Sequence, residues 1–341
     1  MSHKVVFTVS RVVTPYAEEV VKGLGGTLVK VDAPTEEKVI EACHDADACV
    51  GVFEPYSWKV MEKLTRCQII ASIGIGYDRI DVPAATEHGI IVTNVPDYCL
   101  EEVSDHAMAF LLTLDRKLFK TDRLTKQGKW GPVTRDAQPP MAALRGQTLG
   151  LVGFGRIPRT LVRKAQAFGL RVIVYDPYVP KATTEGYGVE MVDFERLLRE
   201  SDFISVHAAL SPENRNMFGL EQFKKMKRTA YFINTARGGL VDENALHTAL
   251  TEGLIQGAAI DVLVQEPPPP DHPLLKLDNI IVTAHTAQFS DSAFIALRRR
   301  PIEEVARVLR GEWPYGWVNP QVKEKFLARW KKPMKETFLN R

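Results

Sequence analysis

Three side chains that could together bind a carboxylate and carry out acid–base chemistry follow one another in the second half of the 341-residue chain: Arg237, Glu266 and His285. Each comes just after a short apolar run that is typical of a buried strand. An arginine offers a planar fork of N–H donors that fits a carboxylate. A histidine beside a glutamate is a plausible acid–base pair, because the carboxylate stabilises the imidazolium and fixes the tautomer. Taken singly, each is more often a surface or capping group, but together they predict acid–base chemistry on an anionic substrate.

A glycine-rich turn is typical of dinucleotide binding. The segment LGLVGFGRIP leads from an apolar run into a helical pattern and places Gly153 and Gly155 in the turn. Glycines there allow a tight turn and a close approach of the backbone to a pyrophosphate, which then sits at the helix N-terminus. Pro158 stands where such motifs carry a third glycine, so the pattern by itself is weak.

Asp176 strengthens the nucleotide interpretation. It ends the next apolar run, about 20 residues after Gly153, as the dinucleotide fingerprint requires. An acidic side chain there can accept hydrogen bonds from the ribose hydroxyls and repels the 2′-phosphate of NADP. The alternative is a turn or capping residue before Pro177. With both glycines upstream, the sequence favours NAD as the cofactor.

These residues need elements that bring them together. Short β-branched runs alternate with amphipathic segments along the chain, which is typical of βαβ units and predicts an α/β protein with two doubly wound parallel sheets. The first series of predicted strands is Val5–Val9, Thr27–Val31, Ala48–Val52, Gln68–Ser72 and Ile90–Thr93. The second series is Leu149–Gly153, Val172–Tyr175, Phe203–His207, Tyr231–Asn234, Ala258–Val262 and Ile280–Thr283.

Two longer helical patterns stand apart from these series. From Glu101 to about Lys126, apolar residues recur at a spacing of three and four, which predicts one long helix. An irregular segment rich in glycine and proline follows, up to Pro140. The second pattern covers residues 290–309 and contains Pro301, where a lost backbone hydrogen bond predicts a kink or a restart.

Composition excludes several classes of protein. The 45% apolar and 25% charged residues are typical of a globular protein, and the length suggests two domains. A net charge of +2 gives no electrostatic footprint for nucleic acid. No apolar stretch approaches the ~20 residues of a membrane span, and the first apolar run is too short for a signal peptide. We therefore expect a cytoplasmic protein that binds neither nucleic acid nor membrane.

Cysteine spacing predicts neither disulfides nor a metal site. The four cysteines form no C-x-x-C and pair with no histidine at zinc spacing, so we expect free thiols and no bound metal. They are Cys43, Cys49, Cys67 and Cys99. The end of the chain is locally basic, which favours a solvated tail or helix over a binding arm.

With Arg237, Glu266 and His285 in that order after the glycine turn, the chain resembles the NAD-dependent D-isomer-specific 2-hydroxyacid dehydrogenases, and most of all their C-terminal-binding-protein-like branch. The likeness extends from about residue 45 to 320, and the segment NTARGGLVDE at 234–243 is very specific. The other matching segments are SIGIGYDRID at 72–81, VSDH at 103–106, RGQTLG at 145–150, YDPY at 175–178, GAAIDV at 257–262 and HTA at 285–287.

The resemblance implies an architecture and an activity. A flavodoxin-like substrate domain would comprise residues 1–100 plus 288–341, and an inserted Rossmann NAD-binding domain residues 101–287. Two crossovers would form a hinge around a cleft that closes to exclude water. Such an enzyme reversibly reduces a small 2-oxo acid to a D-2-hydroxy acid with NADH. It would be a homodimer through the helix at 101–126 and the segment that follows.

The resemblance also implies roles for the catalytic and cofactor residues. Arg237 would hold the substrate's carboxylate and carbonyl, and His285 would be the general acid, with Glu266 behind it. Other matching residues would contact the cofactor. They are Gly153, Gly155, Arg156, Ile157, Asp176, His207, Thr235, Ala236 and Asp261.

Further residues would contact the substrate. The backbone N–H groups of Ile75 and Gly76 would bind its carboxylate, and Tyr98 and Gln288 would face its side chain. Polar groups in that place would lose water beside an apolar substrate, so the sequence favours small polar 2-oxo acids such as hydroxypyruvate or glyoxylate. The alternative is that these side chains point to solvent and the pocket is unselective.

A second function remains open at this point. Because the same branch contains corepressors, the alternative is that this chain is an NAD(H)-responsive binding protein with little or no turnover. Gln288 stands where the animal corepressors of that branch have tryptophan, which argues against a corepressor-like pocket. The complete set of Arg237, Glu266 and His285 favours the enzyme.

Overall fold

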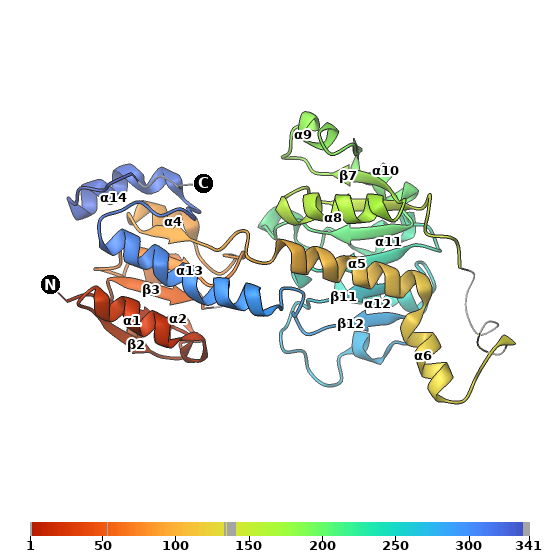
Figure 1. Cartoon of the computed structure of the whole chain (residues 1–341), viewed down its shortest axis with the longest axis horizontal. Coiled ribbons are helices and arrows are strands. Elements are labelled where there is room, and N and C mark those ends of the chain that lie inside the picture. Colours follow the sequence, from red (N-terminus) through yellow and green to blue (C-terminus); the bar gives the residue numbers. More distant parts are fainter. Residues whose placement is uncertain (1, 53, 133, 135–140, 337–341) are drawn as a thin grey trace. The chain divides into compact units, whose positions relative to one another are not determined.

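The computed structural model describes residues 2–52, 54–132, 134 and 141–336, which form two compact units (Figure 1). The first unit comprises Met1–Tyr98 and Ser290–Arg341, and the second comprises Cys99–Phe289. Among the described residues, no helix is long and apolar enough to cross a membrane.

The first unit is built on a five-stranded sheet in which every pair is parallel. The strand order β2-β1-β3-β4-β5 is that of the flavodoxin-like fold. The strands are β1 (Lys4–Phe7), β2 (Thr27–Lys30), β3 (Ala48–Gly51), β4 (Ile69–Ser72) and β5 (Ile91–Thr93).

Helices cover both faces of this sheet. Val5 and Phe7 pack with α1 (Pro15–Gly23) and α13 (Asp291–Leu309), whereas Val6 points to the opposite face, since successive side chains of a strand alternate. The opposite layer consists of α2 (Glu36–Cys43), α3 (Trp58–Met61) and α4 (Val82–Glu87). The four cysteines of the chain are buried free thiols.

Residues 323–336, the described part of the basic C-terminal segment, pack on the first unit. They form helix α14 (Lys323–Trp330) and a turn after it. Arg329 donates to the backbone carbonyls of residues 64 and 65, at 2.7 and 2.9 Å. Lys332 donates to those of residues 308 and 309, each at 2.9 Å. These positive side chains therefore satisfy backbone groups at element ends instead of extending into solvent.

The second unit is built on a seven-stranded parallel sheet of order β12-β11-β10-β9-β6-β7-β8. The strand order reverses between β6 and β9, which makes that crevice the place where a Rossmann fold binds its dinucleotide. The strands are β6 (Thr148–Val152), β7 (Arg171–Tyr175), β8 (Glu190–Met191), β9 (Phe203–Val206), β10 (Tyr231–Asn234), β11 (Gly257–Ile260) and β12 (Ile280–Val282).

Two helical layers also cover the second sheet (Figure 1). One contains α5 (Leu100–Arg116) and α8 (Arg156–Ala167), and the other α10 (Phe194–Glu200), α11 (Leu220–Lys225) and α12 (Glu243–Thr251). The unit also contains α6 (Leu118–Lys126) and α9 (Lys181–Glu185). Short 3₁₀ turns of the chain are Ser10–Val12, Pro212–Asn214, Gly238–Leu240, Pro273–Lys276 and Pro320–Val322.

Two helical predictions differ from the structure. The single helix expected from Glu101 to Lys126 is broken at Lys117, whose φ of 54° is left-handed. The ammonium of Lys117 lies 4.2 Å from the ring centroid of Tyr231, a cation–π contact that favours this conformation. Of the kink or restart expected at Pro301, the restart does not occur, because α13 continues through this buried proline.

Candidate active site

The closest contact between candidate residues joins His285 and Glu266. His285 Nδ1 lies 2.6 Å from Glu266 Oε2. The two residues follow β12 and β11, which are neighbouring parallel strands, so their carboxyl ends meet at one edge of the sheet. A carboxylate only accepts, so Nδ1 donates to it. Nε2 is then the ring nitrogen that would exchange a proton with a substrate.

Glu266 is suited to support a protonated imidazole. Burial raises the pKa of Glu266, but the hydrogen bonds from His285 and from the Leu263 N–H, together with the charges of His285 and Arg237, outweigh burial and bring the pKa below its usual value. The bond from Leu263 is 2.9 Å long and ends on Oε1. The carboxylate is therefore ionised at neutral pH and stabilises the imidazolium.

Asp261 holds the turn that carries His285. The φ of His285 is 53°, which is uncommon for a residue other than glycine. Asp261 is 1% exposed, and its carboxylate accepts from the N–H groups of Thr286 and Ala287, each at 2.9 Å, and from the hydroxyl of Thr283. Its carbonyl accepts from the His285 N–H at 2.8 Å. The expected contact of Asp261 with the nicotinamide stays a prediction, since this carboxylate is engaged within the chain.

Arg237 lies at the same edge of the sheet, after β10. Its guanidinium donates to the Ala236 carbonyl at 2.7 Å, and its own carbonyl accepts from the Asn234 side chain at 2.9 Å. A Cβ on Gly238 would lie 2.1 Å from the carbonyl carbon of Leu263. Glycine is therefore required for the Arg237 turn to pack directly on the loop of Glu266. Three successive strands thus bring the arginine, the glutamate and the histidine together.

The glycine turn lies between β6 and α8. Gly153 has a φ of 92°, and a Cβ there would lie 2.8 Å from the Ala208 nitrogen, so only glycine fits. A Cβ on Gly155 would meet no atom within 4 Å, which leaves its side of the turn open to a ligand. Gly155 is the N-cap of α8 and offers no side chain to its first-turn N–H groups, which begin with Arg156 and Ile157. An uncapped helix N-terminus fits a pyrophosphate.

Asp176 has the turn role that its position allowed, and its expected contact with the ribose stays a prediction. Its Oδ2 accepts from the Phe154 N–H at 2.7 Å, and its Oδ1 accepts from the N–H groups of Tyr178 and Val179 at 2.8 and 3.2 Å. It is therefore a turn residue and also a carboxylate fixed beside the glycine turn. A carboxylate has about four acceptor positions, so capacity for a ribose hydroxyl remains.

Thr235 and His207 complete a site that fits a dinucleotide. Among the described residues, the buried hydroxyl of Thr235 has no hydrogen-bond partner, a situation that costs about 1–3 kcal/mol unless a ligand supplies one. His207 Nε2 lies 2.9 Å from the Ser205 hydroxyl, and burial lowers the pKa of His207 to about 4. His207 is therefore neutral at pH 7 and can line the site without adding charge. Ala236, beside Thr235, is half-buried.

The backbone at Ile75 and Gly76 belongs to the first unit. The carbonyl of Gly74 accepts from the Val95 N–H at 2.8 Å, and the carbonyl of Ile75 accepts from the Asn94 side chain at 2.7 Å. In a trans peptide the N–H points opposite to the carbonyl. The N–H groups of Ile75 and Gly76 therefore point away from residues 94–95, as anion donors could.

Tyr98 and Gln288 are half-buried in their respective units. The Gln288 amide donates to the His285 carbonyl at 2.8 Å, so it holds the same turn as Asp261. Its expected contact with substrate, like that of Tyr98, stays a prediction.

Sequence reasoning missed several residues around the site. Thr283 joins Asp261 to His106, whose Nε2 lies 3.1 Å from the Thr283 hydroxyl. Glu243 accepts from the Val264 N–H at 2.8 Å. The matching segments VSDH and NTARGGLVDE contain His106 and Glu243, but nothing in the sequence alone indicates these contacts.

Comparison with known proteins identifies the family. Residues 108–287 match the family described as D-isomer specific 2-hydroxyacid dehydrogenase, NAD binding domain. The chain is 42% identical over 301 residues to a glyoxylate reductase of Korarchaeum cryptofilum, covering 86% of this chain and 90% of that protein. It is 39% identical over 325 residues to a D-3-phosphoglycerate dehydrogenase of Methanocaldococcus jannaschii, covering 94% of this chain and 61% of that protein.

Solved structures agree with this result. A glyoxylate reductase from Paecilomyes thermophila superposes with a TM-score of 0.84 at 26% identity, over 94% of this chain and 99% of that one. D-lactate dehydrogenase with NAD⁺ from Lactobacillus jensenii gives a TM-score of 0.71 at 27% identity, over 92% and 99%.

The relatives correct one expectation. They are glyoxylate reductases and D-3-phosphoglycerate dehydrogenases, not proteins of the C-terminal-binding-protein-like branch, so the predicted place in that branch is not supported. With a Rossmann unit that matches the family's NAD-binding domain, and an arginine, a glutamate and a histidine on three successive strand ends, the chain belongs to the D-isomer-specific 2-hydroxyacid dehydrogenases and is an NAD-dependent oxidoreductase of 2-oxo and D-2-hydroxy acids.

Proposed function

We propose that the enzyme reduces glyoxylate or hydroxypyruvate with NADH. The observation that carries the proposal is the contact of 2.6 Å between His285 and Glu266, at the sheet edge that also holds Arg237. The name of the relative from Korarchaeum cryptofilum, a glyoxylate reductase that is matched over 90% of its length, supports the substrate class.

The proposed roles follow from the chemistry of reduction. When bound, NADH supplies a hydride to the carbonyl carbon. Arg237 binds the substrate's carboxylate and orients the carbonyl. His285 donates a proton from Nε2 to the carbonyl oxygen, so that the C=O π-electrons become the new O–H bond. Glu266 stabilises the imidazolium before this transfer, and in the reverse reaction His285 accepts the proton.

Two further groups are proposed to bind substrate. The N–H groups of Ile75 and Gly76 would donate to its carboxylate, which accepts several bonds. Tyr98 and Gln288 would face its remaining atoms and favour polar groups.

We expect a preference for small polar substrates. The kcat/KM for hydroxypyruvate should exceed that for 4-methyl-2-oxopentanoate by about tenfold or more, because each polar group left unpaired beside an aliphatic chain costs about 1–3 kcal/mol. Steady-state rates of NADH consumption measure both values, with glyoxylate as a reference substrate that has no side chain. A higher kcat/KM for the branched substrate would contradict the proposal.

We also expect NADH to bind more tightly than NADPH. The Asp176 carboxylate lies beside the Phe154 N–H, where a 2′-phosphate would place a second negative charge. Titration of protein fluorescence should give a Kd for NADH at least about tenfold lower than that for NADPH. The matched variant Asp176→Asn should bring the two Kd values closer together, because it removes the negative charge that repels the 2′-phosphate of NADPH. Equal affinities in the unmodified enzyme would show that Asp176 does not select the cofactor.

We propose that the protein forms a homodimer whose interface lies on the second unit. Large apolar side chains at the start of α6 and after it are exposed, with 53% of Leu118, 63% of Phe119 and 75% of Trp130 accessible. Residues 133 and 135–140, the end of the segment expected to contribute, lie outside the described residues. Sedimentation velocity at micromolar concentration should show a dimer that Phe119→Glu weakens, whereas a clean monomer would refute the proposal.

A further inference from the structure

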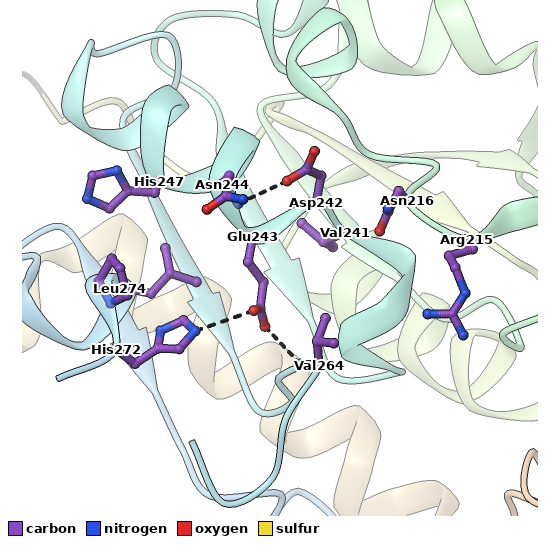
Figure 2. Close-up of a pocket in the computed structure, with 11 residues that line it drawn as sticks. Arg215, Asn216, Val241, Asp242, Glu243, Asn244, His247, Val264, His272 and Leu274 are labelled. Carbon is purple, nitrogen blue, oxygen red and sulfur yellow. Dashed lines mark hydrogen bonds and ion pairs between the residues drawn. The ribbon is translucent and has the colours of Figure 1, made fainter. Parts of the chain in front are cut away.

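One carboxylate contacts both ends of the loop that carries Glu266 (Figure 2). Glu243 is the first residue of α12. Its Oε1 accepts from the Val264 N–H at 2.8 Å, and its Oε2 lies 3.3 Å from His272 Nε2. Glu266 lies between Val264 and His272 in the sequence, so Glu243 closes the loop in which Glu266 sits.

Neighbouring N–H groups of this loop serve two different glutamates. The Leu263 N–H donates to Glu266 Oε1, and the next N–H, that of Val264, donates to Glu243 Oε1. Gly238 packs directly against the peptide that joins Leu263 to Val264. A shift of the backbone at Val264 would therefore move the donor that orients Glu266.

The composition of the loop makes it a stiff connector. Residues 267–270 are four consecutive prolines, each of which fixes its own φ angle. His272, at the far end, is mostly buried and precedes the 3₁₀ turn Pro273–Lys276. A stiff loop with both ends held by Glu243 keeps Glu266 in one position.

We propose that Glu243 is a positioning residue for catalysis: it holds the loop of residues 264–272 so that Glu266 stays within hydrogen-bond distance of His285. The proposal rests on the roles given above to Glu266 and His285. Glu243 itself acts only through the loop, from the side of α12.

Substitution of Glu243 should not threaten the fold. Glu243 and His272 line a cavity of about 400 Å³ together with Asp242, His247 and Arg215 (Figure 2). Water can fill the space that a shorter side chain leaves, because a polar cavity of this size admits several molecules. Asp242, the N-cap of α12, remains in place in such variants.

A double-mutant cycle separates positioning from a general structural role. Glu243→Ala, Glu266→Gln and the double variant are compared with the unmodified enzyme in kcat, KM for hydroxypyruvate, Kd for NADH and the pH profile of kcat/KM. Glu243→Gln keeps an oxygen for the Val264 N–H and serves as the conservative variant. Glu221→Ala, in the first turn of α11 with an exposed ion pair to Lys224, is the matched control.

We expect Glu243→Ala to lower kcat by about tenfold, with KM and the Kd for NADH within about twofold of the unmodified enzyme. The alkaline limb of the pH profile of kcat/KM should move to lower pH, as it should in Glu266→Gln. The double variant should be no slower than Glu266→Gln within about twofold. Glu243→Gln should recover most of the loss, and Glu221→Ala should lose nothing.

Two outcomes would overturn the inference: full kcat in Glu243→Ala, or losses that multiply in the double variant. Should Glu243→Ala not fold, Glu243→Asp takes its place in the cycle, because it is one methylene too short to reach both loop ends. Full kcat in Glu266→Gln would instead contradict the proposed role of Glu266, whatever Glu243 does.

Discussion

Replacing His285 with alanine is expected to lower kcat for 2-oxo acid reduction by at least about 100-fold, the usual effect of losing a general acid. The developing alkoxide then has no donor at the position that Nε2 occupies, and the ionised Glu266 is left without its partner at 2.6 Å. NADH should still bind with unchanged affinity, because the glycine turn and Asp176 follow β6 and β7, whereas His285 follows β12 at the far edge of the sheet.

Single-turnover rates with saturating NADH measure this effect, and fluorescence titration measures the cofactor affinity. His44→Ala is the matched control, since His44 is an exposed histidine at the end of α2. Activity near that of the unmodified enzyme in His285→Ala would disprove the assignment of the general acid.

The sequence predicts the candidate site because the site lies on strand ends. Arg237, Glu266 and His285 each follow an apolar run, and parallel strands place their carboxyl ends at one edge of the sheet. The same reasoning places Asp176 beside the glycine turn. Strand positions could be predicted well, because buried parallel strands are continuous runs of β-branched residues. The two-residue strand β8 (Glu190–Met191) has no such run and was not predicted.

Contacts that depend on three-dimensional packing could not be predicted. Nothing in the sequence indicates that Lys117 adopts a left-handed φ, since the contact with Tyr231 joins residues far apart in the chain. The carboxylate of Asp261 was expected to face the cofactor, but its bonds to the turn of His285 become visible only when β11 and β12 are paired. From the sequence alone, Glu243 is an ordinary acidic residue in the first turn of a helix. Its contacts with Val264 and His272 become visible only in the folded structure.

Replacing Arg237 with lysine is the second change with a large expected effect. Lysine keeps the positive charge but loses the planar fork, so a carboxylate can no longer be bound by two parallel hydrogen bonds. We expect kcat/KM to fall by about 10- to 100-fold, since a hydrogen bond to a charged group contributes roughly 1.5–3 kcal/mol. Most of this loss should appear in the KM for the 2-oxo acid. The carboxylate is present in both the ground state and the transition state, so both lose the same interaction.

The electrostatic environment of Glu266 sharpens this test. The charge of Arg237 is one of the causes that lower the pKa of Glu266. Arg237→Lys retains this charge, whereas Arg237→Met removes it as well as the fork. If the fork alone matters, the two variants should lose similar kcat/KM for hydroxypyruvate. A much larger loss in Arg237→Met would show that the positive charge contributes beyond the fork. A shift in the pH profile of kcat/KM in Arg237→Met alone would show that this charge also maintains the Glu266–His285 pair. Arg199→Lys, at an exposed arginine on α10 of the same unit, is the control, and a kcat/KM in Arg237→Lys equal to that of this control would contradict bidentate binding.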